Sequence, residues 1–322
     1  MASYPGTKVF LNKNNIVHLS INPWYFCNFG CKFCYLTPDQ LKDRKLLPLE
    51  VLDKRLSEIK SFGVDLGHAD IYGGEILLLP KGYMQEMKEI LHKHDIDEIE
   101  IITNLSAYNP DVVEDPDFGI SVSYDFEHRE KHDVVFANIM KMQRPFTILT
   151  LATPEVIKMD LDNAMNWLST LRNLMAWEIK PYSINQANSA RVTHNEYEEF
   201  VKKIITSPIS KHYEFLNEST LVQAISHQRN SFSDDHVYIT PSGNFGVLEF
   251  DPNDREYFLE LDSFDKYADW TFLEKNRIYD NNFCANCEYM GECLSEHLRP
   301  VKSMEDGCNG YFHLIKWAEE NL

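Results

Sequence analysis

Residues 17–34 read VHLSINPWYFCNFGCKFC, a short β-type run that is followed closely by three cysteines. The run Val17–Ile21 predicts a strand, and Gly30 in the following loop lets the backbone wrap closely around a metal centre. Three thiolates can ligate three irons of a cubane and leave the fourth iron open to a substrate or cofactor, as at catalytic metal sites. The predicted ligands are Cys27, Cys31 and Cys34. A zinc site with three cysteines and a distant fourth ligand is the alternative.

Strand-like and helical patterns alternate through the first two thirds of the chain. The predicted strands after the first are His68–Tyr72, Ile99–Thr103, Gly119–Tyr124, Thr147–Leu151 and Trp177–Tyr182. Helical faces between them are formed by Leu52, Leu56 and Ile59, by Tyr83, Met87, Ile90 and His94, and by Met165, Leu168, Leu171 and Met175; a further helix, Glu196–Thr206, buries Phe200, Val201 and Ile204. This alternation predicts an α/β fold in which six β/α units curl into a partial barrel, with functional residues at the carboxyl ends of the strands.

The pattern changes after about Ser207. A hairpin is predicted at His236–Phe250, with its turn at Pro241–Asn244, and the remainder reads as loop-rich. We therefore expect two domains, residues 1–235 and residues 236–322. The second carries four cysteines, enough to close a tetrahedral or cubane site completely, and a structural zinc ribbon is the alternative to an iron–sulfur cluster. These four are Cys284, Cys287, Cys293 and Cys308.

Bulk composition narrows the class of protein. The 322 residues are 43% hydrophobic, which suits one domain and a smaller appendage. Fifty acidic and 31 basic residues give a formal charge of −19, which disfavours nucleic acid and anionic lipid as partners. No run approaches the roughly 20 apolar residues that cross a bilayer, and the N-terminus lacks the blocks of a secretory signal, so we expect a cytoplasmic protein without membrane contact. Seven cysteines, an odd count, favour metal ligation over disulfides.

The first cysteine cluster resembles a known signature. CxxxCxxC after the first strand, with Phe33 before the third cysteine, is similar to the motif of the radical S-adenosylmethionine superfamily. The resemblance implies a [4Fe–4S] cluster coordinated by the three cysteines and by S-adenosylmethionine, with Phe33 against the adenine. It also implies an electron donor such as flavodoxin or ferredoxin, and a 5′-deoxyadenosyl radical that removes a hydrogen atom from the substrate.

Other strand ends resemble cofactor-binding segments of the same family. Gly73-Gly74-Glu75 is similar to its GGE motif, which holds the methionine ammonium, although Ile76 stands where a proline is usual. The resemblance adds Asn104, Ser123 and Asp125 as ribose- and carboxylate-binding residues, and Arg129 as a partner of the cofactor carboxylate. An ordinary polar turn is the alternative for Ser123 and Asp125, and a solvated charge at a helix start is the alternative for Arg129. Lys180–Gln186 is expected to face the substrate.

The spacing Cx2Cx5Cx14C of the second cluster resembles the C-terminal auxiliary-cluster domain called SPASM, or its shortened form Twitch. The full SPASM pattern has two further cysteines where this chain has Leu248 and His297. The resemblance therefore implies one auxiliary iron–sulfur cluster, for which we expect [4Fe–4S]. The two clusters then consume all seven cysteines and leave no thiol to return a hydrogen atom to a substrate radical, which favours a net two-electron oxidation.

The resemblance implies an oxidoreductase-type enzyme that cross-links or dehydrogenates its substrate, and we favour a ribosomally made peptide. The alternative is dehydrogenation or rearrangement of a small molecule such as an aminocyclitol or sugar, and a second alternative is a non-catalytic metal-binding module. Because only about 16 residues precede the first strand, a peptide substrate is expected to need a separate leader-recognition protein.

Overall fold

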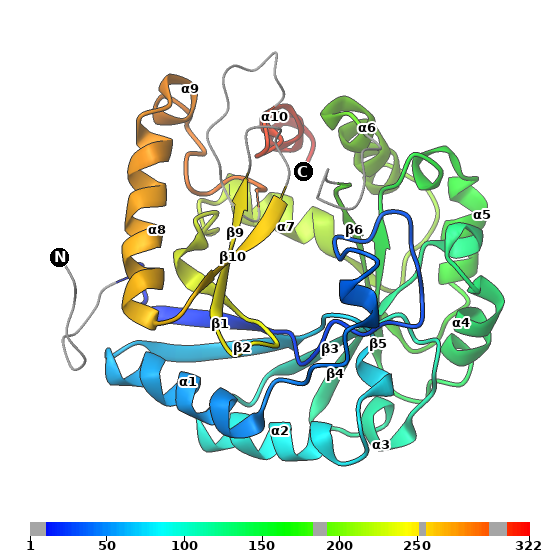
Figure 1. Ribbon diagram of the computed structural model, residues 1–322. Helices are drawn as coiled ribbons and strands as arrows, with labels where there is room; N and C mark the ends of the chain where they lie inside the picture. The colour runs from blue at the N-terminus through cyan, green and yellow to red at the C-terminus, as the bar shows by residue number, and fades with distance from the viewer. Residues whose placement is uncertain (1–10, 183–191, 251–255, 296–307) are drawn as a thin grey trace.

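The computed structural model describes residues 11–182, 192–250, 256–295 and 308–322 (Figure 1). Its described strands form one sheet in the order β10-β9-β8-β1-β2-β3-β4-β5-β6-β7. No helix in these ranges combines the length and the apolar character needed to cross a membrane.

The first seven strands are neighbours in chain order and run parallel to one another. They are β1 Ile16–Ile21, β2 Asp65–Ile71, β3 Ile99–Thr103, β4 Phe118–Ser123, β5 Phe146–Leu151, β6 Leu174–Lys180 and β7 Glu214–Phe215. The helices that connect them are α1 Leu49–Ser61, α2 Tyr83–Lys93, α3 Pro110–Val113, α4 His132–Ile139, α5 Leu161–Leu168 and α6 His194–Ile205. Figure 1 shows the helices around the outside of a curved sheet. The predicted α/β fold is confirmed, and nothing in the topology conflicts with a partial barrel.

Short 3-10 helices lie in the connections, at η1 Gln40–Lys42, η2 Ile76–Leu78, η3 Phe126–His128, η4 Val156–Lys158 and η5 Ser233–Asp235. η2, η3 and η4 lie in the loops that follow β2, β4 and β5, at the carboxyl edge of the sheet.

The helical faces agree with the sequence in part. The predicted faces of α1 and α6 are buried. In α2 the buried residues are Met84, Met87 and Leu91, so the predicted face is displaced, and His94 follows the helix as its cap. The prediction for Met175 is wrong, because α5 ends at Leu168 and the chain enters β6 at Leu174, which leaves Met175 on the strand with 60% of its surface exposed.

The C-terminal part extends the same sheet. β8 His236–Ile239 pairs with β1 in parallel, and β9 Phe245–Phe250 pairs with β8 in antiparallel fashion, which confirms the predicted hairpin. Gly243 in its turn has φ +78°, and a Cβ there would lie 2.5 Å from Val51 Cγ1, so the turn packs directly on α1. The division at residue 235 falls between η5 and β8, within a continuous sheet, and remains a prediction.

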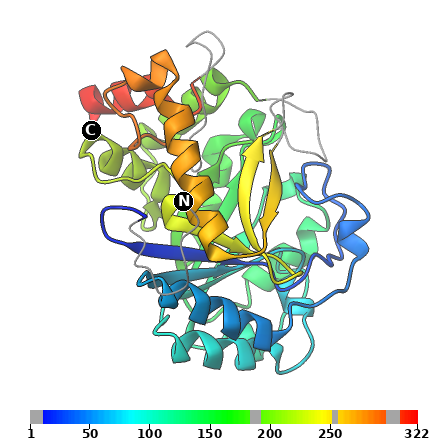
Figure 2. The same cartoon turned by 60° about the vertical axis from the view of Figure 1, so that its left-hand side comes forward.

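Two elements contradict the prediction that the remainder is loop-rich. β10 Glu256–Leu261 adds a third antiparallel strand, and the 16-residue helix α8 Phe264–Tyr279 packs beside the strands (Figure 2). Aromatic residues are poor helix formers in isolation, but tertiary burial of Phe264, Tyr267 and Trp270 stabilises α8. The other helices are α7 Leu216–Ile225, α9 Asn282–Ala285 and α10 Phe312–Asn321.

Candidate active site

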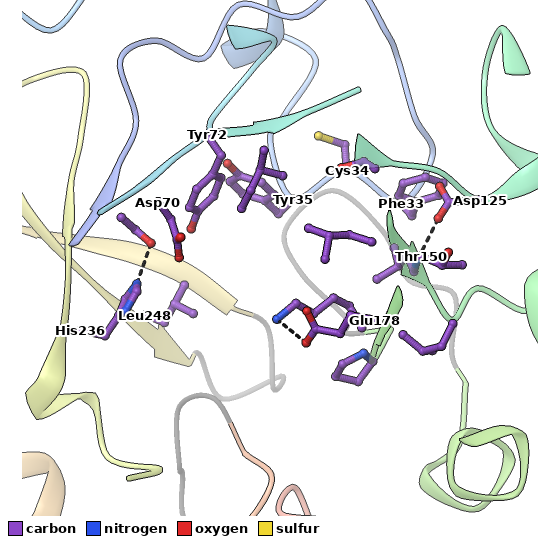
Figure 3. Close-up of a pocket in the computed structure, with 18 of the residues that line it drawn as sticks. Phe33, Cys34, Tyr35, Asp70, Tyr72, Asp125, Thr150, Glu178, His236 and Leu248 are labelled. Carbon is purple, nitrogen blue, oxygen red and sulfur yellow. Dashed lines mark hydrogen bonds and ion pairs between the residues drawn. The ribbon is translucent and has the colours of Figure 1, made fainter. Parts of the chain in front are cut away.

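A cavity of about 780 Å³ lies inside the curved sheet and at the strand ends (Figure 3). The structure brings ten of the eleven residues predicted for the first cluster and its cofactor to the wall of this cavity. They are Cys27, Cys31, Phe33, Cys34, Gly73, Gly74, Asn104, Ser123, Asp125 and Arg129. Glu75 is the eleventh, and it lies behind the wall.

The cysteine loop is held by short-range hydrogen bonds. The backbone N–H of Cys34 donates to the carbonyl of Cys31 at 3.0 Å, which forms a turn within the motif. The N–H of Phe29 approaches Cys27 Sγ at 3.4 Å, and Asn104 Nδ2 approaches the same sulfur at 3.5 Å. Donors aimed at sulfur favour the thiolate form that a metal requires.

Burial has the opposite effect on the free thiols. It raises the pKa of Cys31 to about 11, and it also raises the pKa of Cys27 and of Cys34, while the nearby Arg129 cation lowers all three. Metal ligation therefore has to displace protons from these thiols.

The glycines of the predicted GGE turn make a close backbone approach. Gly73 has φ +156°, and a Cβ there would lie 2.4 Å from the Trp24 carbonyl oxygen; a Cβ on Gly74 would lie 1.9 Å from the Phe26 carbonyl oxygen. The N–H of Gly74 donates to the Trp24 carbonyl at 3.1 Å. By contrast, a Cβ on Gly30 would meet only Glu130 Oε2, at 4.0 Å. The glycines required for close packing around the cysteine loop are thus Gly73 and Gly74.

The Glu75 side chain joins two strand ends. It is fully buried, and its carboxylate accepts hydrogen bonds from Leu77 N at 2.9 Å, from Asn104 N at 2.8 Å and from the Thr103 hydroxyl. Burial raises the pKa of Glu75, and the three hydrogen bonds oppose that rise. The carboxylate therefore positions Asn104, and its predicted contact with the cofactor ammonium remains a prediction.

Asp125 and Arg129 form a buried ion pair. Arg129 Nη1 donates to Asp125 Oδ2 at 2.9 Å, and the Leu151 N–H donates to Asp125 Oδ1 at 2.8 Å. The Arg129 side chain is 9% exposed, so the alternative of a solvated charge is wrong. Its guanidinium lies 5.7 Å from the Phe33 ring centroid, and its buried Nε has no hydrogen-bond partner among the described residues.

Several other residues of the cavity wall were not predicted from the sequence. Figure 3 shows Asp70, Tyr72, His236 and Leu248 on one side of the cavity and Glu178 on another. His236 Nε2 lies 2.6 Å from the Ser20 hydroxyl, and Lys180 pairs with Glu178 at 3.0 Å. Polar residues within otherwise apolar strands were the signal in the sequence that could have indicated these wall residues. Only the fold shows which of them face the same cavity.

The expected substrate-facing segment Lys180–Gln186 is only partly described. Lys180 and Pro181 line the cavity, whereas the segment from residue 183 lies outside the described residues. Its substrate-facing role remains a prediction.

The four later cysteines line a second, much smaller cavity. Its walls are largely apolar, and they include Phe283, Tyr289, Met290 and Phe312. A Cβ on Gly310 would lie 2.5 Å from Cys293 Sγ, so the chain approaches this sulfur closely. Burial raises the pKa of Cys293 to about 11. Leu248 lines the larger cavity, and His297 lies outside the described residues.

The two cysteine regions also meet the same large cavity. Leu294, Tyr311 and Leu314, which flank the second cluster in the chain, line the cavity that contains the first cysteine loop. Within the described residues, no three His, Cys, Asp or Glu side chains are close enough to hold a single metal ion. Each set of thiols therefore lines one cavity, but the described side chains of a set do not lie close enough together to coordinate one metal ion.

Residues 21–116 match the family model of the radical SAM superfamily. This segment contains the three-cysteine loop, the Gly73–Glu75 turn and Asn104, so the match falls on the residues that carry the resemblance. The match supports the expectation of an enzyme that uses S-adenosylmethionine and a [4Fe–4S] cluster.

Solved structures share the architecture of the whole chain. Native anSMEcpe with bound AdoMet has a TM-score of 0.65 at 13% identity, covering 95% of this chain and 100% of that one. The same protein with AdoMet and the Cp18Cys peptide has a TM-score of 0.63 at 13% identity, covering 95% and 99%. Streptococcus suis SuiB bound to precursor peptide SuiA has a TM-score of 0.59 at 16% identity, covering 86% and 70%. No curated protein matches the sequence. At these identities the likeness shows the fold.

Proposed function

We propose that this protein oxidatively modifies a ribosomally made peptide, by cross-linking or dehydrogenation, in a reaction started at the first cysteine site. The observation that carries the proposal is the shared cavity. Its walls contain the three-cysteine loop and the predicted cofactor residues, and also side chains next to the second cysteine cluster.

The donor set at the first site suits the implied cofactors. Three thiols line one cavity, which leaves one iron of a [4Fe–4S] cluster for S-adenosylmethionine. Arg129 Nε has no hydrogen-bond partner among the described residues, and its N–H suits an anionic group such as a carboxylate. When bound, the cofactors supply a 5′-deoxyadenosyl radical that removes a hydrogen atom from the substrate.

The residues of the chain itself bind and orient the cofactor and exclude water from it. Asp125 holds the Arg129 guanidinium in place at 2.9 Å, so little side-chain entropy is lost when an anion binds to it. Phe33 offers a flat surface for adenine beside that guanidinium. Glu75 fixes the backbone N–H of Asn104, and the crowded Gly73 and Gly74 present their backbone to the cavity. Ser123 supplies a hydroxyl at the end of β4.

The second site suits a closed auxiliary centre. Cys284, Cys287, Cys293 and Cys308 line one small cavity with apolar walls, and four thiolates complete the coordination of a [4Fe–4S] cluster. Such a centre is a one-electron acceptor whose potential the protein can tune, as an oxidative outcome requires. Zinc would fill the same thiol set, and metal analysis separates the two.

Peptide is the substrate class that we favour because two of the similar solved structures contain bound peptides. A small molecule such as an aminocyclitol or sugar is the second candidate, since polar groups such as Asp70 and Glu178 at the cavity wall could bind hydroxyl or amino groups. We expect an electron donor of the flavodoxin or ferredoxin type and, for a peptide, a separate leader-recognition protein.

The test is an anaerobic incubation of the reconstituted protein with reductant, S-adenosylmethionine and either candidate peptides or aminosugars. Formation of 5′-deoxyadenosine together with a product lighter by two hydrogens supports the proposal for the class that reacts. Deuterated water adds a second readout: a product with unchanged formula and one deuterium bound at carbon would contradict the oxidative outcome. A variant without the first three cysteines is the control for background cleavage.

A further inference from the structure

Among the residues that the structure describes, β10 is an edge strand of the sheet. The strand order begins with β10, whose paired strand among the described residues is β9. The strand has six residues, Glu256–Leu261. An edge strand presents backbone N–H and C=O groups that can pair with another extended chain.

The hairpin register shows which backbone groups face outward. The N–H of Thr240 donates to the Asn244 carbonyl, and Tyr238 lies opposite Gly246, so even-numbered residues of β9 bond to β8. Odd-numbered residues of β9 therefore bond to β10, where Leu259 lies opposite Val247. It follows that the main-chain groups of the even-numbered β10 residues, Phe258 and Glu260, point to the free edge.

This edge adjoins the candidate active site. Tyr257 and Phe258 line the large cavity, and the Phe258 ring lies 6.0 Å from the ring of Tyr35, the residue after Cys34. In both overall views α8 lies on one side of the β9–β10 pair, and the loop that follows β1 and carries the first cysteines lies on the other (Figures 1 and 2). A chain that paired with β10 would thus pass beside the site.

Two of the residues that natural proteins use to block sheet edges, Lys and Pro, are missing from β10, whose sequence is EYFLEL. The Glu260 carboxylate turns back to the hairpin, where it accepts hydrogen bonds from the Ser242 hydroxyl at 2.7 Å and from Asn244 Nδ2 at 2.8 Å. Its charge is therefore engaged inside the hairpin.

We propose that the substrate peptide binds as an added strand along β10, through main-chain hydrogen bonds to Phe258 and Glu260. This inference rests on the proposed peptide function. Strand addition takes its affinity from the peptide backbone and presents every second side chain to one face. Alternate side chains of the bound peptide then face the cavity, and the enzyme tolerates variation in the others.

The first test is residue-resolved hydrogen exchange on the full chain, reconstituted anaerobically with S-adenosylmethionine and loaded with peptides selected from a random library. Strand addition predicts that exchange at Phe258 and Glu260 slows by about tenfold or more, while Leu259, already bonded to β9, changes little. Peptides that bind and are oxidised without slowing exchange at Phe258 and Glu260 overturn the edge proposal alone. Oxidation of an aminosugar with no peptide bound overturns the proposed function and this inference together.

A second test uses the period of a strand. N-methylation of a selected peptide, one amide at a time, should weaken binding by about fivefold to tenfold at alternate positions. Glu260→Pro, which removes an edge N–H, should weaken binding by a similar factor relative to Glu260→Ala, which loses the same carboxylate contacts. A scan without alternation, or equal affinities of the two variants, contradicts strand addition. The N-methyl scan decides the question even if Glu260→Pro fails to fold.

Discussion

The two sets of cysteines lie in very different surroundings. The first three line a cavity of about 780 Å³, whereas the later four line a small cavity with apolar and aromatic walls. A buried ion pair, Asp125–Arg129, lies at the first. Ligand count and enclosure together distinguish catalytic metal sites from closed structural ones, so this difference supports the separate roles that we propose for the two sets of cysteines.

The largest effect is expected at the open site. Replacement of Cys27, Cys31 and Cys34 by Ala should abolish formation of 5′-deoxyadenosine and lower the iron content from about eight to about four per chain, because only the second ligand set remains. Iron analysis and chromatography of the reaction measure both. Stoichiometric zinc with about four irons in the unmodified protein would instead remove the auxiliary cluster and leave the radical site intact.

The closed site should respond differently. Replacement of Cys284, Cys287, Cys293 and Cys308 by Ala should leave cofactor cleavage measurable and abolish the oxidised product, because the substrate radical loses its electron acceptor. Mass measurement of the product and quantification of 5′-deoxyadenosine test this. Undiminished oxidation by this variant would show that the two regions do not act in one reaction.

The behaviour of Glu75 sharpens the same comparison. If the Glu75 carboxylate contacts the cofactor ammonium, as the resemblance to the GGE motif implies, Glu75→Gln weakens cofactor binding more than it disturbs folding. The structure places the carboxylate in three buried hydrogen bonds, so an amide would turn a donor toward a backbone N–H or the Thr103 hydroxyl. We now expect a loss of about 2–3 kcal/mol in the free energy of unfolding.

Denaturant unfolding measures this loss, and exposed Glu89→Gln is the matched control. An unfolding free energy within experimental error of the parent, together with weaker cofactor binding, would instead support a direct contact between Glu75 and the cofactor.

Local motifs made the first site predictable. The cysteine spacing, the Gly73–Glu75 turn and Asn104 lie within residues 21–116, directly after strands whose pattern was clear. The orientation of Glu75 was not predictable, because its partner Thr103 lies on another strand.

The other walls could not be predicted for the same physical reason. Asp70, Glu178 and His236 come from three strands far apart in the chain, and only the curvature of the sheet brings them to one cavity. α8 escaped prediction because tertiary burial of its aromatic residues outweighs their low helix propensity.

The smallest expected effect is on the pH dependence of the free energy of unfolding, through one carboxyl group in each part of the molecule. Burial raises the pKa of Glu100 on β3 to about 7, and that of Glu274 on α8 to about 7, from an ordinary value of 4.5. The folded protein therefore keeps each proton at pH values where the unfolded chain has released it. The stabilisation is complete below pH 4.5 and is lost as pH rises to about 7.

Each group should contribute a slope of at most about 1.4 kcal/mol per pH unit within that window, since one proton is involved. Glu274 accepts hydrogen bonds from the backbone N–H and the hydroxyl of Ser233 at two different carboxylate oxygens, and the single amide oxygen of Gln can keep one of them. Glu274→Gln and Glu100→Gln should each flatten the pH dependence of the unfolding free energy, measured in denaturant from pH 4.5 to 7.5. The exposed Glu89→Gln should leave it unchanged. If the slope persists in both variants, the pH dependence of the unfolding free energy comes from other groups. If only one variant flattens the slope, a single part of the molecule sets that pH dependence.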